Sequence, residues 1–322
     1  MKAFITGISG FAGPHLAELL LKEGAEVSGM VHGKKSRDSK AGTSGHSIGK
    51  DVRLFEGDIR DSSQLSRTIK KVRPDEIYHL AAVSNVPYSL ENPGLAFEIN
   101  FHGTRKLFDA VLKSGISAKV LFVGSADSYG DISPKSLPIR EDAPFRPASP
   151  YALSKAAADL LAYQYFRNHG LHVLRARPFN HIGPGQDASF VCSNFAAQVA
   201  RIKAGKAKPV VKVGNLSAKK DFSDVRDVVR AYRLILKRGK PGEAFNICGG
   251  KAYSIGSILR KLIQLSGMEI EIRREEKRFR KVDTKIVFGD YSALYSRTGW
   301  TPKVPLEESL KNILEYHGAA WP

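Results

Sequence analysis

The fold is decided by residues 6–13, which read Thr6-Gly7-Ile8-Ser9-Gly10-Phe11-Ala12-Gly13 and lie between an apolar run, KAFIT, and an amphipathic stretch, PHLAELLLKEG. In a turn from a parallel strand to a helix, the first glycine permits the turn. The second glycine lets a diphosphate approach the backbone, and the third lets the helix pack on the strand. The helix amino end then faces the phosphates. An ordinary strand-to-helix turn is the alternative, but the context favours dinucleotide binding at Gly7, Gly10, Phe11 and Gly13.

Strand-like and helix-like segments alternate from this turn onward. Apolar strands are predicted near residues 2–7, 26–31, 52–58, 76–82, 119–125 and 172–180, and helices near 14–24, 62–71, 95–113 and from 150. Strands separated by such helices predict an α/β fold, a Rossmann-type doubly wound parallel sheet. The alternation loosens after Phe179. We therefore expect a dinucleotide-binding domain at 1–177, with later contributions near 221–248, and a smaller C-terminal α/β lobe at 178–322 that mainly binds substrate.

Composition narrows the class of partner. The 322 residues carry 50 Lys and Arg against 32 Asp and Glu, a net charge of +18. The basic residues are spread along the chain without a nucleic-acid motif, so an anionic small substrate is favoured over nucleic acid. No apolar run reaches the roughly 18 residues of a membrane span, and no signal-peptide layout is present, so we expect a cytoplasmic protein that does not bind a membrane. Cys192 and Cys248 lie far apart, which predicts neither a disulfide framework nor a metal site.

The end of the second strand, GMVHGKK, bears on the choice of dinucleotide. NAD sites usually have an acidic residue here to hold the ribose hydroxyls. This chain has none between Met30 and Arg37, and has His32, Lys34 and Lys35 instead. The pattern favours the 2′-phosphate of NADP(H), with NAD(H) as the alternative. A solvated basic loop would look the same.

The third strand is followed by Gly57-Asp58-Ile59-Arg60-Asp61. Asp58 is placed to accept a hydrogen bond from an adenine amino group. Its alternative role is a helix N-cap, which is common for Asp at such a turn.

Two further stretches carry groups able to do chemistry. Tyr151 and Lys155 are four residues apart at the start of a predicted helix and share one face. A nearby ammonium is expected to lower the tyrosine pKa, so that the phenol exchanges a proton with a carbonyl oxygen near neutral pH. Upstream, VGSADSYG (123–130) holds Ser125 and Asp127. The combination with the glycine-rich turn is much more specific than either motif alone.

Together these motifs resemble the extended short-chain dehydrogenases/reductases, in the branch that modifies nucleotide sugars. The resemblance spans nearly the whole chain, from TGISGFAG through GDIRD, HLAA, GSADSYG and RPFNHIGPGQ to GDYSALYSRTGW. It implies Tyr151 as the acid/base, Ser125 as a hydrogen-bond partner of the substrate oxygen, and Lys155 on the nicotinamide ribose. Asn100 would support the helix geometry. The cofactor contacts that it implies are Gly7, Gly10, Phe11, Gly13, His32, Asp58, Ile59, Leu80, Ala81, Ala82, Tyr151, Lys155 and Pro178.

The second half is similar to the GDP-hexose subgroup, which contains both 4,6-dehydratases and 4-ketosugar reductases. The similarity implies Arg280 as the diphosphate ligand with Asp283 as its partner, although the register could slip to Arg278 or the run could be solvated. Lys220 stands where the family usually has Arg, and it keeps the charge without the forked geometry. The implied substrate contacts are Ser84, Ser125, Asn180, Asn194, Lys220, Arg280 and Asp283.

The choice between dehydratase and reductase depends on Asp127. Dehydratases of this superfamily typically carry a Glu there to remove the C5 proton, whereas Asp127 is one methylene shorter and is preceded by Ser125 and Ala126. A base displaced by about an ångström can lose on the order of a hundredfold in rate. Cys192-Ser193-Asn194 also stands where dehydratases tend to have Thr-Arg-Lys. We therefore expect a reductase that uses NADPH to reduce the C4 ketone of GDP-4-keto-6-deoxy-D-mannose.

Other readings stay open at this point. They are GDP-mannose 4,6-dehydratase, another nucleotide-sugar reductase or epimerase, and a non-catalytic dinucleotide-binding regulator. The family resemblance also implies a homodimer formed through the helices near Leu95–Lys113 and Tyr151–His169.

Overall fold

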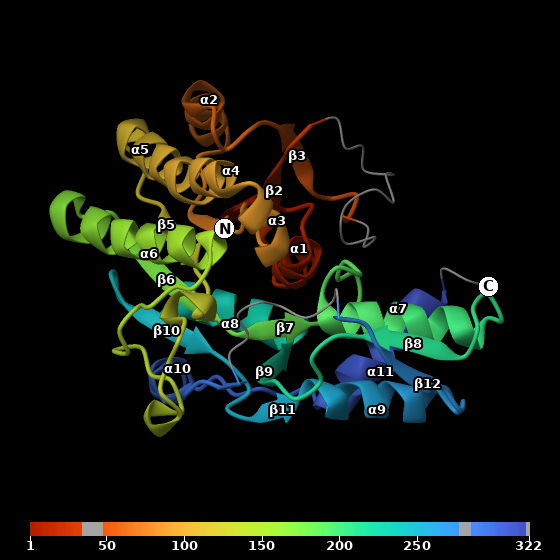
Figure 1. Cartoon of the computed structure of the whole chain (residues 1–322). Helices are drawn as coiled ribbons and strands as arrows, with labels where there is room; N and C mark the ends of the chain where they lie inside the picture. The colour runs from red at the N-terminus through yellow and green to blue at the C-terminus, as the bar shows by residue number, and fades with distance from the viewer. Residues whose placement is uncertain (34–47, 277–284, 320–322) are drawn as a thin grey trace.

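The computed structural model describes residues 1–33, 48–276 and 285–319. Its largest element is a seven-stranded sheet in the order β10-β6-β5-β4-β1-β2-β3, in which every neighbouring pair is parallel (Figure 1). The strands are β1 (Lys2–Thr6), β2 (Glu26–Val31), β3 (Arg53–Glu56), β4 (Glu76–His79), β5 (Lys119–Val123), β6 (Val173–Pro178) and β10 (Ala244–Ile247). The predicted Rossmann-type α/β fold is confirmed.

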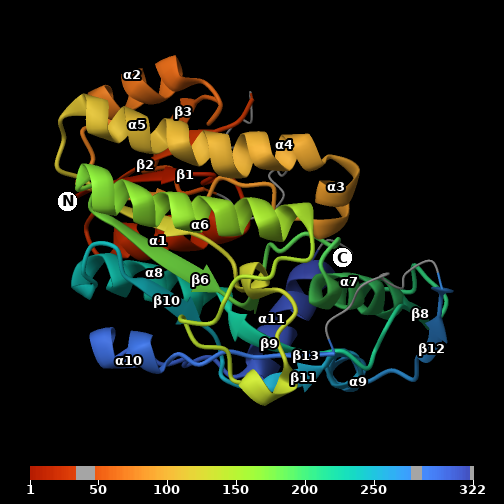
Figure 2. The same cartoon turned by 60° about the vertical axis from the view of Figure 1, so that its left-hand side comes forward.

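Helices cover both faces of this sheet because the inner strands are apolar on both sides. On one face α1 (Ala12–Lys22) and α8 (Val225–Arg238) pack against Ala3, Ile5 and Leu174. On the other face α2 (Ser62–Val72), α5 (Thr104–Ser114) and α6 (Pro150–His169) pack against Phe4, Ile77 and Phe122. Figure 2 shows α5 and α6 lying side by side along that face. The helix before each strand thereby sets the edge at which the strand ends.

The long helix predicted near Leu95–Lys113 is not uniform. It begins as α4 (Pro93–Phe97), widens into a π-helical turn at Glu98–Gly103, and continues as α5. The widened turn contains the buried Asn100, whose side chain bonds to the loop after β4. A polar side chain that leaves its helix for such a loop is a physical reason for a π-turn at this position.

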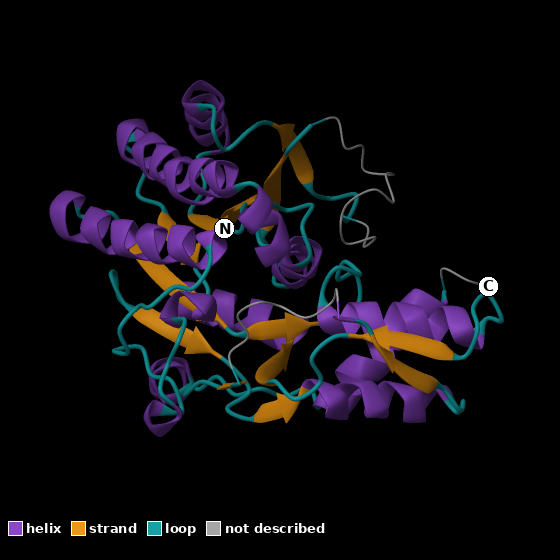
Figure 3. Ribbon diagram, in the orientation of Figure 1, coloured by secondary structure: helices purple, strands orange, loops and turns teal. Residues whose placement is uncertain are grey.

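The second half contains short strands that the sequence did not reveal (Figure 3). A four-stranded sheet is made of β7 (Asn180–Ile182), β9 (Lys219–Asp224), β11 (Ala252–Ser254) and β13 (Ile286–Val287), and a two-stranded sheet of β8 (Val210–Val213) and β12 (Glu271–Arg274). The stretch FNHIGPGQ thus includes the short strand β7. Strands this short carry too few residues to show an alternation in sequence.

Three helices enclose the core of this second lobe. They are α7 (Val191–Lys203), α9 (Ile255–Ser266) and α11 (Leu306–Gly318), which pack around Phe195, Val211 and Leu259. Two smaller helices are α3 (Val86–Glu91) and α10 (Ser292–Thr298). Across the three described ranges, no helix has both the length and the apolarity needed to cross a membrane.

Candidate active site

The carboxyl ends of the parallel strands meet at one edge of the large sheet, and the predicted site residues gather there. The chain order along the sheet reverses between β1 and β4, which is where α/β sheets of this type bind ligands. The residues that follow the strands are Gly7 after β1, His32 after β2, Asp58 after β3, Leu80 after β4, Ser125 after β5 and Phe179 after β6.

The three glycines of the first turn are required for different reasons. A Cβ at Gly7 would lie 2.6 Å from the Ala81 nitrogen, and one at Gly13 would lie 2.2 Å from the Ile8 oxygen. Both glycines are therefore fixed by backbone packing. A Cβ at Gly10 would meet only the Gly7 oxygen, at 3.1 Å, and otherwise points into open space. The protein itself thus leaves space for a side chain at Gly10. A bound diphosphate close to the backbone would explain why this position is a glycine.

The amino end of α1 fits the same ligand. Phe11 precedes the helix without a side-chain cap, and the first turn contains no acidic residue. The N–H groups at a helix amino end attract an anion, and here no side chain of the turn satisfies them. The loop and helix therefore fit the diphosphate of a dinucleotide.

Phe11 also contacts the second lobe. Its ring is stacked on His181 of β7 with the centroids 5.7 Å apart, and lies edge-on to His15 at 5.9 Å. His15 Nε2 is 2.9 Å from the Pro184 oxygen. The segment after β6 is thereby held directly on the glycine-rich turn.

Asp58, His32 and Arg60 form a cluster at the ends of β2 and β3. Arg60 pairs with Asp58 at 2.6 Å, and His32 Nδ1 lies 3.5 Å from the same carboxylate. Arg60 lowers the pKa of Asp58. The helix-cap alternative for Asp58 is wrong, because Asp61 caps α2 by accepting hydrogen bonds from the N–H groups of Ser63 and Gln64. Lys34, Lys35 and Arg37 lie outside the described residues.

The remaining predicted cofactor residues lie around this edge. Ala81 donates its N–H to Thr6 Oγ1 at 3.3 Å, which places Leu80, Ala81 and Ala82 beside the glycine-rich turn. Ile59 is buried, and Pro178 ends β6 in register with Ile247. These positions are compatible with backbone and apolar contacts to a dinucleotide.

Ser125, Asp127 and Tyr151 are brought together at the end of β5. The extended Ser125 begins a single 3₁₀ turn, and its Oγ accepts a hydrogen bond from the Asp127 N–H at 3.1 Å. Ser125 is also hydrogen-bonded to Tyr151, and the Asp127 charge acts on that phenol. Ser125 and Tyr151 are buried, whereas Asp127 is exposed. The arrangement presents two hydroxyls and one carboxylate to the same small volume.

Burial and the charge of Asp127 raise the pKa of Tyr151 above its ordinary value, while the hydrogen bond with Ser125 works against this rise. The expected lowering of the tyrosine pKa by Lys155 is therefore wrong. Lys155 Nζ instead donates to the Val123 oxygen at 2.6 Å. The phenol stays protonated at neutral pH and can act as a proton donor.

Lys155 is itself shifted. Burial lowers its pKa to about 7, and the charge of Asp159 opposes that change. The lysine is only 4% exposed, so its ammonium has little solvent to stabilise it. Hydrogen bonds from the Lys155 ammonium to bound hydroxyls, such as those of a ribose, would replace part of the stabilisation that water gives to an exposed lysine.

A chain of buried polar groups connects β1 to α6, the helix that carries Tyr151 and Lys155. Thr6 Oγ1 is 2.7 Å from His79 Nδ1, and His79 Nε2 is 2.9 Å from Thr104 Oγ1. Burial lowers the pKa of His79 to about 3, so the imidazole is neutral and can donate from one nitrogen and accept at the other. Thr104 donates to the Asn100 oxygen, and Asn100 bonds both to the loop after β4 and to Ser154. Asn100 thus occupies the supporting position that the family resemblance implied.

Asp159 is a site residue that the sequence reasoning missed. It accepts hydrogen bonds from Arg175 at 2.7 Å and from Arg177 at 2.8 and 2.9 Å. Asp159 lies four residues after Lys155, which itself lies four residues after Tyr151. This repeated spacing on one helix face was the sequence signal that could have identified Asp159. The carboxylate holds two arginines behind the catalytic helix and favours the charged form of Lys155.

The predicted substrate residues are placed less uniformly. Asn180 is exposed and donates to the Asp221 carbonyl at 3.2 Å, and Lys220 lies next to it on β9. Ser84 is exposed in the loop after β4. The Asn194 amide is engaged locally, since it donates to the Ala188 oxygen in the loop before α7 and accepts from Gln198 on α7. Arg280 and Asp283 lie outside the described residues.

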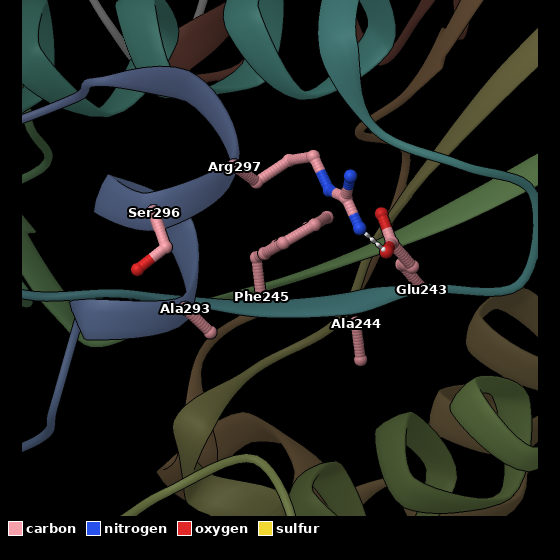
Figure 4. Close-up of a pocket in the computed structure, with 6 residues that line it drawn as sticks. All are labelled: Glu243, Ala244, Phe245, Ala293, Ser296 and Arg297. Atoms are coloured by element: carbon pink, nitrogen blue, oxygen red, sulfur yellow. Dashed lines mark hydrogen bonds and ion pairs between the residues drawn. The ribbon is translucent and has the colours of Figure 1, made fainter.

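A separate cavity of about 460 Å³ lies between β10 and α10, lined by Glu243, Ala244, Phe245, Ala293, Ser296 and Arg297 (Figure 4). An ion pair joins Arg297 to Glu243. The cavity lies near the amino end of β10, away from the edge where the strands end in the site. No group of three or more His, Cys, Asp or Glu within the described ranges could hold a metal ion.

Comparisons with known proteins place this geometry in a family. The model of the family described as GDP-mannose 4,6 dehydratase matches residues 4–313. GDP-6-deoxy-D-mannose reductase from Pseudomonas aeruginosa is 38% identical over 75% of this chain and 79% of its own. GDP-mannose 4,6-dehydratase from Yersinia enterocolitica is 31% identical over 95% of this chain and 91% of its own.

The solved structure of RMD from Pseudomonas aeruginosa complexed with NADPH is 32% identical, covers 99% of both chains and has a TM-score of 0.85. Its fold is therefore that of the described chain over nearly its whole length. The chain therefore belongs to the GDP-mannose 4,6 dehydratase family, in the nucleotide-sugar branch of the extended short-chain dehydrogenases/reductases, and is an oxidoreductase that uses NAD(P).

Proposed function

We propose that this enzyme uses NADPH to reduce the C4 ketone of GDP-4-keto-6-deoxy-D-mannose and forms a GDP-6-deoxyhexose such as GDP-D-rhamnose. The observation that carries the proposal is the placement of the buried Ser125 and Tyr151 hydroxyls beside the short, exposed Asp127. A bound nicotinamide would supply a hydride to the ketone carbon. Tyr151 then donates its phenolic proton to the oxygen, which Ser125 orients.

The direction of reaction decides which protonation state of Tyr151 is needed. Reduction of a ketone needs a proton donor, whereas the first step of a dehydratase oxidises an alcohol and needs a base. A phenol that holds its proton at neutral pH is ready for the first of these tasks. The reductase from Pseudomonas aeruginosa supports the same choice by its 38% identity.

Asp127 supports the proposal by its length and exposure. It is one methylene shorter than the glutamate of dehydratases, and its side chain lies at the exposed end of the 3₁₀ turn. We assign it a secondary role near the sugar, as a ligand of a hydroxyl group. The second candidate remains GDP-mannose 4,6-dehydratase, which the family description and the relative from Yersinia enterocolitica favour.

NADPH rather than NADH is part of the proposal. The end of β2 carries His32 and no carboxylate, and the Asp58 carboxylate beside it is already paired with Arg60. A 2′-phosphate would therefore meet positive charge at this point. The NADPH bound to the structure from Pseudomonas aeruginosa agrees with this preference.

The test is an assay of the purified protein with GDP-4-keto-6-deoxy-D-mannose and either NADPH or NADH. We expect loss of NADPH absorbance and a product heavier than the ketosugar by two hydrogens. GDP-mannose without added reductant should stay unchanged. Conversion of GDP-mannose to the ketosugar would overturn the proposal in favour of the dehydratase.

Two extensions sharpen the result. UDP- and dTDP-linked 4-ketosugars assayed in parallel identify the nucleotide base. Asp127→Asn should keep most of the reductase activity, with the neighbouring exposed Asp131→Asn as the matched control. Loss of activity in the first variant alone would make Asp127 a catalytic acid or base.

The proposal extends to organisation and location. We propose residues 1–177, with contributions near 221–248, as the cofactor domain and 178–322 as the substrate lobe. The exposed Leu153, Leu160 and Tyr163 on α6, beside Leu112 on α5, support a homodimer through these two helices. The cytoplasm is the proposed location, and the unpaired Cys192 and Cys248 are compatible with a reducing compartment.

A further inference from the structure

Asp221 is a fully buried carboxylate whose hydrogen-bond partners are backbone amides. Its exposed fraction is 0%, and it lies on β9 next to Lys220. It accepts hydrogen bonds from the N–H groups of Gly249 at 2.6 Å, Gly250 at 3.0 Å and Gly289 at 3.3 Å. The N–H of Lys251 also stabilises the charge. In residues 1–33, 48–276 and 285–319, no cation pairs with this carboxylate through its side chain.

These bonds join segments that are far apart in the chain. Gly249 and Gly250 follow β10 of the large sheet, whereas Gly289 follows β13 of the small one. The Asp221 carbonyl also accepts the Asn180 side chain from β7. Figure 1 shows β9 between β7 and β11 in the small sheet. Because Asp221 lies on β9 and accepts from the turn after β10, its carboxylate connects the small sheet to the large one.

The atoms around these glycines leave little room for a side chain at each position. A Cβ at Gly289 would lie 2.5 Å from the Phe179 ring and 2.9 Å from the Cys248 sulfur. A Cβ at Gly249 would lie 3.1 Å from the Asp221 carboxylate, and Gly250 has a positive φ of 72°. Three glycines therefore form a cradle that fits one carboxylate.

A buried carboxylate that pairs with no cation of the described residues is an expensive way to join loops. The amide donors offset part of the desolvation, yet burial still raises the pKa of Asp221 to about 6. A role in stability alone could be filled by a neutral side chain. Asn180 bonds to the main-chain carbonyl of Asp221, and Lys220 precedes Asp221 on β9. The family resemblance implies both residues as contacts of the nucleotide sugar.

We propose that Asp221 is a positioning residue of the nucleotide-sugar site, an inference that rests on the proposed function. Its carboxylate holds the turn at Gly249–Gly250 and the start of the segment at Gly289 in fixed positions around Asn180 and Lys220. It touches neither cofactor nor reacting atoms. Its effect is therefore on substrate affinity and not on the chemical step.

Asp221→Asn tests this because the carboxamide turns one acceptor oxygen into a donor that faces the amides. We expect KM for the ketosugar to rise by about ten- to a hundredfold, the range that follows from losing hydrogen bonds to a charged group. We expect kcat to change less than about threefold, because Tyr151 and Ser125 are not displaced. The dissociation constant of NADPH should stay within about twofold, since the glycine-rich turn is untouched.

Asp227→Asn is the matched control. Asp227 is also buried and also accepts two backbone N–H groups, from Lys303 and Val304 at 2.8 Å, but it contacts no proposed site residue. Both variants should lower the melting temperature. Only Asp221→Asn should raise KM, and equal changes of KM in the two variants would overturn the proposal.

Calorimetric titration with GDP, UDP and dTDP separates this inference from the proposed reaction. The nucleotide that binds the wild-type protein should bind Asp221→Asn more weakly by the same factor as KM, whichever reaction the enzyme performs. If Asp221→Asn does not fold, the milder Gly249→Ala crowds the same carboxylate and should weaken nucleotide binding. Unchanged binding in these variants, or no binding of any of the three nucleotides by the wild type, would overturn the inference.

Discussion

At the scale of single residues, burial shifts the protonation of Tyr151 and Lys155, the pair proposed to be catalytic. Tyr151 and Lys155 are both almost fully buried, and burial favours the neutral form of each. For the tyrosine this means a retained proton, and for the lysine a pKa of about 7. Burial therefore keeps the Tyr151 phenol protonated. It also makes the charge of Lys155 depend on neighbouring groups such as Asp159.

Tyr151→Phe should lower kcat by about a hundredfold or more, because the proton donor is lost. NADPH binding, followed by fluorescence titration, should be unchanged. Tyr163→Phe on the exposed side of the same helix is the control and should leave kcat unaltered. A fall of less than about tenfold in the first variant would remove Tyr151 from the mechanism.

Lys155→Met should stabilise the protein at pH 6 by about 1 kcal/mol, although turnover is lost. The folded pKa of about 7 lies below the ordinary 10.5, so below pH 7 the folded state contains a buried charge that disfavours folding. This penalty declines from pH 7 upward and vanishes above 10.5. Urea unfolding at pH 6 and pH 9 should show the larger gain at pH 6.

The exposed Lys113→Met is the control for that series and should leave the free energy of unfolding unchanged at both pH values. A gain that grows with pH in Lys155→Met would contradict the assignment.

At the scale of elements, side chains from the helix before α5 and from the end of β3 hold neighbouring segments in place. The π-helical turn before α5 directs Asn100 to the loop after β4, and the end of β3 directs Asp58 toward β2. Each contact joins segments that carry cofactor residues. The geometry of the site is therefore sensitive to substitutions outside the catalytic group.

Asn100→Ala should lower the free energy of unfolding by about 2–3 kcal/mol, because it leaves buried partners at Val83 and Ser154 unsatisfied. Urea unfolding measures the change. Asn92→Ala, which removes one exposed side-chain bond to the Tyr88 oxygen, should lower it by less than about 1 kcal/mol. Equal losses would mean that the Asn100 network adds no stability.

Arg60→Ala should raise KM for NADPH by about tenfold and leave KM for NADH nearly unchanged. Without Arg60, the negative charge of the Asp58 carboxylate is left uncompensated beside the place proposed for the 2′-phosphate. Arg53→Ala, at the opposite end of β3, is the matched control. The ratio of the two KM values is the readout, and an unchanged ratio would place the phosphate elsewhere.

At the scale of the whole molecule, the site forms where two sheets of different size meet. The large sheet supplies the strand ends, and the segment after β6 crosses to β7 while it packs on Phe11. The net charge of +18 favours the approach of an anionic nucleotide sugar. The exposed apolar side chains of α5 and α6 form a face away from this junction.

Leu160→Glu should convert the proposed dimer into a monomer, because it puts a charge into the apolar face of α6. Leu160 is 59% exposed in the single chain. Leu90→Glu on α3, where the leucine is 61% exposed, is the control and should stay dimeric. Sedimentation analysis measures both, and a monomeric wild type would exclude the dimer.

The sequence by itself determined the parallel sheet, the glycine-rich turn and the group of Ser125, Tyr151 and Lys155. The turn and the pair of Tyr151 and Lys155 are encoded by residues close together in the chain, where the spacing of strand, turn and helix fixes the geometry. Ser125 lies 26 positions before Tyr151 and was named through the family resemblance. Only the tertiary structure decided the protonation of Tyr151, the chain from Thr6 to Asn100 and the cradle around Asp221. Thr6 and His79 are 73 positions apart, and Asp221 and Gly289 are 68 apart. Contacts at such separations, and the burial that shifts a pKa, exist only after the chain has folded.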